Sequence, residues 1–88
     1  MISVDTNQLP VVVTTGANNF TMYIPDLHVT VEGSDYVELY ARAAVCASAI
    51  LYYNKEHNLT TTRSTDFDKV QSMCEGKKDQ FPAFLGII

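Results

Sequence analysis

The sequence predicts one α+β domain in which an antiparallel sheet of three to four strands is covered on one face by one long helix. Three observations predict it: short apolar runs separated by turns before residue 34, helical spacing of apolar side chains from about Tyr36 to Glu56, and an apolar run at the end. Because 88 residues leave room for one hydrophobic core, we expect residues 1–88 to form a single domain. The expected order is β-β-β-α-(short α)-β.

Three short strands are expected first, at residues 9–15, 20–24 and 27–32. The first holds a run of valines, and the second alternates Phe20, Met22 and Ile24 with Thr21 and Tyr23. Pro25 and Asp26 interrupt the pattern before the third strand. Brief turns between the strands indicate an antiparallel meander with one face buried. Its open face is expected to carry the following side chains: Val12, Tyr23, His28 and Thr30.

The long helix has a clear predicted start and end. Asp35 with Glu38 three residues later is the spacing of a capping box, and Asn58 suits a left-handed stop after the last turn. Apolar residues recur every three or four positions between these limits. We expect the small residues in its middle to let the helix approach the sheet closely; they are Ala41, Ala43, Ala44, Ala47, Ser48 and Ala49.

A short helix and a last strand complete the predicted domain. Thr65 with Asp68 suggests a second cap, and the helix is expected to bury Phe67, Val70 and Cys74 and to end at Gly76. Residues 81–88 are expected to add a strand to the meander. Pro82 has no N–H for a ladder, so it belongs at the start of that strand or on an edge of the sheet.

No pattern of catalytic, metal-binding or cofactor-binding residues is present, so we do not expect an enzyme. His28 and His57 stand alone, the glycines are isolated, and Cys46 and Cys74 have no Cys or His at ligand spacing. Asp26 and Glu32 bracket one predicted strand and lie roughly 20 Å apart at ~3.3 Å per residue, too far for a metal pair. Both cysteines are expected to be free and structural.

Charge and composition bear on the partner and the compartment. The net charge is −4 and the six basic residues are scattered, which favours a basic protein over nucleic acid as the partner. With neither a leader-like N-terminus nor a spanning segment in the sequence, we expect a cytoplasmic protein without membrane contact. RNA is the alternative partner. Most aromatic residues are expected on buried faces, but Tyr23 should lie open to stack a base, with Lys77 and Lys78 nearby for phosphates.

The segment Phe20-Thr21-Met22-Tyr23-Ile24-Pro25-Asp26-Leu27, followed by Glu32-Gly33-Ser34-Asp35 and a helix, resembles the HicB-like antitoxin family. Residues 63–67 and the apolar end also look like the polar loop and last strand of that family, so the resemblance covers about residues 9–88. His28-Val29-Thr30 stands where the family usually has Pro-Gly-Cys. The DNA-binding extension of many members is not expected here, because the chain stops at Ile88.

The resemblance implies a degenerate ribonuclease-H-like domain that lacks catalytic carboxylates. Its implied function is to bind and neutralise a small basic HicA-like toxin that cleaves mRNA. We expect the partner-binding residues to be Tyr23, Asp26, His28 and Glu32. A residual nuclease that depends on Asp26 is a third hypothesis. The resemblance and the open sheet face also imply a homo-oligomer, a dimer or a tetramer, through paired faces or edges.

Overall fold

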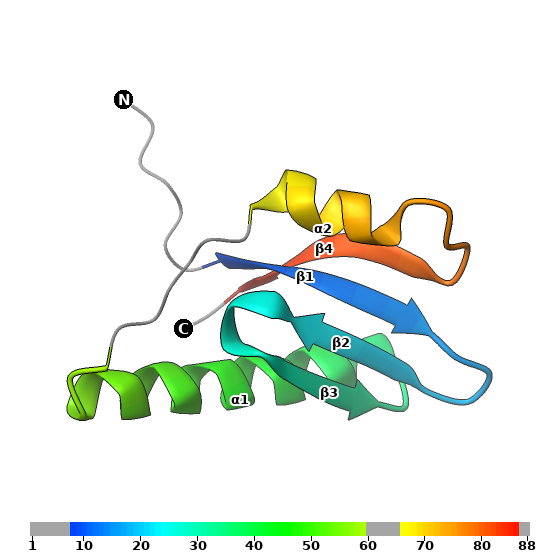
Figure 1. The fold of residues 1–88 in the computed structure, drawn as a ribbon. Coiled ribbons are helices and arrows are strands. Elements are labelled where there is room, and N and C mark those ends of the chain that lie inside the picture. The colour runs from blue at the N-terminus through cyan, green and yellow to red at the C-terminus, as the bar shows by residue number, and fades with distance from the viewer. Residues whose placement is uncertain (1–7, 60–65, 87–88) are drawn as a thin grey trace.

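The computed structural model describes residues 8–59 and 66–86, and it has the predicted order of elements (Figure 1). The elements are β1 (Gln8–Thr15), β2 (Phe20–Ile24), the 3-10 turn η1 (Pro25–Leu27), β3 (Val29–Gly33), α1 (Tyr36–Glu56), α2 (Phe67–Cys74) and β4 (Gln80–Gly86). All four strands form one antiparallel sheet in the order β3-β2-β1-β4. The α+β class, the long helix and the addition of the last strand to the meander are therefore confirmed.

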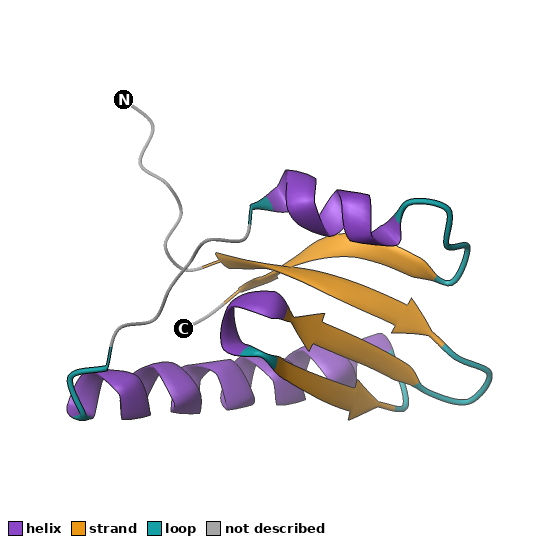
Figure 2. Ribbon diagram, viewed as in Figure 1, coloured by secondary structure: helices purple, strands orange, loops and turns teal. Residues whose placement is uncertain are grey.

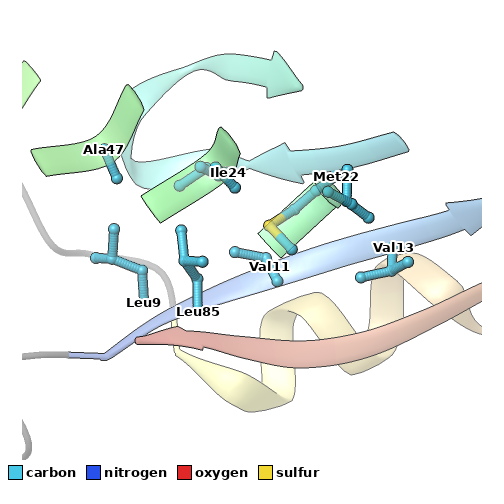
Figure 3. Packing of buried hydrophobic residues seen from close by; sticks show 9 residues of the cluster. Leu9, Val11, Val13, Met22, Ile24, Ala47 and Leu85 are labelled. Carbon is cyan, nitrogen blue, oxygen red and sulfur yellow. The ribbon is translucent and has the colours of Figure 1, made fainter. Parts of the chain in front are cut away.

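The main core lies between α1 and one face of the sheet (Figure 3). Alternate residues of three strands point toward α1, since successive side chains of a strand face opposite sides. Its fully buried members are Leu9, Val11, Val13, Met22, Ile24, Leu39, Ala43, Ala47 and Leu85. Burying each larger side chain contributes roughly 1.5–3 kcal/mol, so this layer carries most of the stability of the domain.

The second face of the sheet is not open across its whole width, contrary to the prediction. Helix α2 packs on β1 and β4 (Figure 2), and Val70 and Cys74 bury Val12 there. The rings of Phe67 and Phe84 stack on the same side with centroids 4.8 Å apart. The face of α2 that holds Phe67, Val70 and Cys74 was predicted; the strand surface that it covers was not.

His28 is not a strand residue, so this part of the prediction was wrong. Pro25–Leu27 forms the 3-10 turn η1, and His28 ends it in the left-handed conformation with φ 55°. Its N–H donates to the Pro25 carbonyl at 3.3 Å. Proline favours the first position of such a turn, and the left-handed residue then returns the chain into β3, which starts at Val29.

The N-terminus of α1 is capped as predicted. The Glu38 N–H donates to Asp35 Oδ1 at 2.7 Å, and Glu38 Oε1 accepts from the Ser34 N–H at 2.9 Å. The reciprocal bond thus reaches Ser34 rather than the Asp35 backbone. At the other end Asn58 has φ 55°, the left-handed stop expected after the helix.

Asp35→Ala is expected to destabilise the protein by about 1 kcal/mol, because it leaves the N–H of Glu38 without its acceptor. Urea unfolding followed by circular dichroism measures the change. Asp35→Asn is the matched control, since asparagine caps about as well as aspartate. Equal losses in the two variants would contradict the capping role.

The cap of helix α2 lies one residue later than predicted. The acceptor for the Lys69 N–H is Asp66 Oδ1 at 2.9 Å, so Asp66 is the cap. Thr65 lies outside the described residues. Helix α2 ends at Cys74, two residues before its predicted end at Gly76, which has φ +77°. The last strand starts at Gln80 rather than Phe81, and residues 87–88 of its predicted span also lie outside the described part.

Both edges of the sheet carry a feature that disfavours pairing with another strand. Strand β3 is one edge, and there Arg42 Nη1 donates to the Glu32 carbonyl at 3.3 Å. Strand β4 is the other edge, and Pro82 interrupts its row of donors because proline has no N–H. The prediction that Pro82 lies on an edge or at a strand start is confirmed.

Candidate functional site

The part of the second sheet face that α2 leaves uncovered is formed by β2 and β3. Tyr23 pairs with Thr30, and Thr21 pairs with Glu32, so these four side chains share one face. Tyr23 is 37% exposed, and Thr30 and Glu32 are exposed as well. Tyr23 and Glu32 are diagonal neighbours across the two strands, within reach of each other's long side chains. We call this area the open sheet patch; it brings two of the four predicted partner-binding residues together.

Asp26 and His28 do not belong to the open sheet patch. Both lie in the turn after β2, where Asp26 is half-buried in the 3-10 turn and His28 is exposed at its end. The prediction treated residues 27–32 as one strand, so it expected His28 beside Thr30 on the same face. The 3-10 turn removes that alternation. His28 is therefore available at a corner of the molecule rather than on the sheet.

An open groove with a volume of about 590 Å³ runs between α2 and β4. Its lining residues are Asp68, Gln71, Ser72, Cys74, Glu75, Gln80 and Pro82. Two of them, Asp68 and Glu75, are carboxylates and none is basic, so the lining itself carries only negative charge, with Lys77 close to Cys74 at its border. The two elements follow each other along the chain, but the way α2 lies against β4 depends on tertiary packing, so sequence reasoning missed the groove. The one available signal was the polar side of α2, where Asp68, Ser72 and Glu75 recur at helical spacing.

The aromatic side chains are far more exposed than predicted. Tyr36, Tyr52, Tyr53, Phe81 and Phe84 all have large exposed fractions. At the end of the sheet next to the start of α1, the ring of Tyr36 lies 4.4 Å from that of Phe20 and 6.2 Å from that of Phe81. For Tyr52 and Tyr53 the prediction failed because the apolar periodicity of α1 continues into its C-terminal half, beyond the part that packs on the sheet. Helix α1 in fact has no buried residue after Ala47.

Two groups have a raised pKa, and burial is the main cause of each. Burial raises the pKa of Tyr40, and the nearby Tyr36 adds to the shift. Burial also raises the pKa of the Cys74 thiol, while Lys77 opposes this. A buried, protonated thiol is a poor nucleophile, so Cys74 acts as a core residue. The folded protein holds both protons more tightly than the unfolded chain, and the corresponding stability is lost only as the pH rises beyond their ordinary pKa values.

Within residues 8–59 and 66–86, no group of three or more His, Cys, Asp or Glu side chains is arranged to hold a metal ion. Cys46 and Cys74 are both free. No helix of the described chain is long and apolar enough to cross a bilayer. The surface features of the described residues that are available for binding a partner are the open sheet patch, the acidic groove and the exposed aromatic rings.

The fold defines a class of protein, an α+β domain in which a four-stranded antiparallel sheet lies between a long helix and a short one. Comparison of the chain with models of protein families, with curated proteins and with solved structures found no match.

Proposed function

We propose that the chain is a non-enzymatic, cytoplasmic binding protein of the HicB-like antitoxin type, which neutralises a small basic HicA-like toxin that cleaves mRNA. The observation that carries this proposal is the groove between α2 and β4, whose lining includes Asp68 and Glu75 and no basic side chain. A net charge of −4 acts in the same direction, because it attracts a basic partner over long range.

Glu32 and Asp26, the two acidic residues predicted to bind the partner, lie in different places. Glu32 is exposed on the open sheet patch, where its carboxylate is available to a lysine or arginine of the partner. Tyr23 beside it offers a large, partly apolar ring, the kind of side chain that often anchors an interface. Asp26 and His28 flank this area from the η1 turn.

Co-expression with the product of the neighbouring gene, followed by copurification, tests the proposal. The expected result is a stable complex with a small basic protein, and loss of mRNA cleavage when the complex forms. A neighbouring product that is not basic, or a basic one that neither copurifies nor is inhibited, would refute the toxin assignment.

Asp68→Asn together with Glu75→Gln is expected to weaken the complex about tenfold at low salt. Each exposed ion pair contributes up to ~1 kcal/mol, and 1.4 kcal/mol is a factor of ten in affinity. Titration calorimetry at two salt concentrations measures the loss, which should shrink as salt rises. Glu56→Gln together with Asp35→Asn also removes two negative charges, both outside the groove; it is the matched control and should bind as the wild type does. A similar loss in the control would show that net charge alone matters.

RNA binding through the open sheet patch is the second candidate, favoured by the exposure of Tyr23. Filter binding with single- and double-stranded RNA separates the two functions. Salt-sensitive binding at micromolar protein that is lost in Tyr23→Ala would support the RNA candidate, and no binding would remove it.

A further inference from the structure

Helix α2 covers a small apolar cluster that the sheet separates from the main core. Its buried members are Val12 of β1 and Val70 and Cys74 of α2, with Phe67 packed against them. The main core lies on the other face of the sheet, against α1. Figure 2 shows the two helices on either side of the strands. The side chains that hold α2 on the sheet are therefore not those that hold α1 there.

This second cluster is much smaller than the main core. Among the described residues it has three buried side chains, whereas the main core has nine. None of the three is larger than valine, and Phe67 beside them is only half-buried. Because the stabilisation from burial grows with the apolar area removed from water, detaching α2 is far less costly than detaching α1.

Helix α2 is also too short to persist without the sheet. It has eight residues, and isolated helices shorter than about 12–15 residues are marginal in water. Its caps are local, since Asp66 Oδ1 accepts from the Lys69 N–H and the Cys74 carbonyl accepts from the Lys77 N–H at 3.1 Å. Once its apolar face leaves the sheet, the helix therefore unfolds as one unit, which is how parts of a domain open locally.

The pairing of β4 with β1 limits this opening on the C-terminal side. The Thr15 N–H donates to the Asp79 carbonyl at 2.8 Å, directly before β4. From there the two strands stay paired as far as Gln8 and Gly86. Strand β4 also buries Leu85 in the main core. It is thus held by contacts that do not involve α2, and it remains in the sheet when α2 leaves.

We propose that α2 is a detachable cover, which opens as a unit while the main core stays folded, and which uncovers Val12 and takes the groove apart. Five of the seven groove residues belong to α2 or to its C-cap, namely Asp68, Gln71, Ser72, Cys74 and Glu75. The groove therefore exists only while α2 is docked. This proposal concerns the chain by itself and does not depend on the proposed function.

The rate at which the Cys74 thiol reacts with a disulfide reagent tests the proposal. Cys74 is 7% exposed, so it reacts only after α2 opens. The parent protein is the full chain with Cys46→Ala, which removes the other cysteine; circular dichroism verifies its fold. We expect labelling without urea, and a rate that rises with urea much less steeply than global unfolding does, because opening α2 exposes little surface. A thiol that is labelled only as the whole domain unfolds would overturn the proposal.

Two buried valines separate local from global opening. Val70→Ala removes two methyl groups from the second cluster, so it should speed labelling about tenfold. Alanine forms helix better than valine, so α2 itself is not put at risk. Val11→Ala removes the same atoms from the main core. It should lower the urea midpoint of unfolding and leave the labelling rate without urea within about twofold of the parent.

Val37→Ala is the control at an exposed valine, 82% exposed on α1, and should change neither the labelling rate nor the urea midpoint. Equal acceleration by Val70→Ala and Val11→Ala would mean that Cys74 is reached only through global unfolding, and the detachable cover would be ruled out. The same conclusion would follow if Val70→Ala did not speed labelling at all.

Discussion

Leu39→Ala is expected to destabilise the protein by about 2–5 kcal/mol, the range for truncating a buried leucine. Leu39 is the largest fully buried side chain of α1, and it lies in the main core. Small residues follow it along the same face, at Ala43 and Ala47, so no neighbour on the helix is able to fill the cavity. Such a loss is a large part of the 5–15 kcal/mol that holds a domain together.

Thermal and urea unfolding measure this effect in the full chain. A loss of 1 kcal/mol lowers the midpoint by roughly 4–8 °C in a domain of this size, so the expected shift is roughly 8–40 °C. Leu59→Ala is the matched control, because Leu59 is the same residue type and is 53% exposed. Its expected change is within ~0.5 kcal/mol. Comparable losses in the two variants would contradict the packing of α1 described above.

Gly33→Ala is expected to destabilise the protein by about 1–3 kcal/mol, the cost of overpacking a tight contact. Gly33 ends β3 directly against the first turns of α1. A Cβ there would lie 2.6 Å from the backbone nitrogen of Leu39 and 2.7 Å from its Cα. A change of side-chain rotamer cannot move these backbone atoms, so the helix must move away from the sheet.

Gly86→Ala provides the control for the glycine effect. A Cβ at Gly86 meets no atom within 4 Å, so this substitution should leave stability nearly unchanged. Urea unfolding of both variants measures the difference. If Gly33→Ala were as stable as the wild type, the close approach of β3 to α1 would be wrong. The double variant with Leu39→Ala should be non-additive, because the two residues share one contact.

Parts of the candidate site followed from the sequence. Strict alternation along residues 20–24 predicted that Tyr23 faces away from the core, and β2 is regular enough for this to hold. Alternation failed at His28, because η1 interrupts the strand and a 3-10 turn has no period of two. The sequence did not predict the groove between α2 and β4, since only tertiary packing brings the residues of these two segments together.

The long helix likewise has features that the sequence determines and features that only the tertiary structure decides. Its limits, Tyr36 and Glu56, and its cap at Asp35 are local features, and the sequence alone determined them together with the α+β class and the order of the elements. Periodicity marked a broad apolar surface on α1 without telling which part is buried, because apolar residues occur around the whole helix. Only the tertiary structure decided that Leu39, Ala43 and Ala47 face the sheet and that α2 covers Val12 on the other side. The physical reason is that local preferences act within a few residues, whereas the choice of buried face depends on which surfaces meet and exclude water.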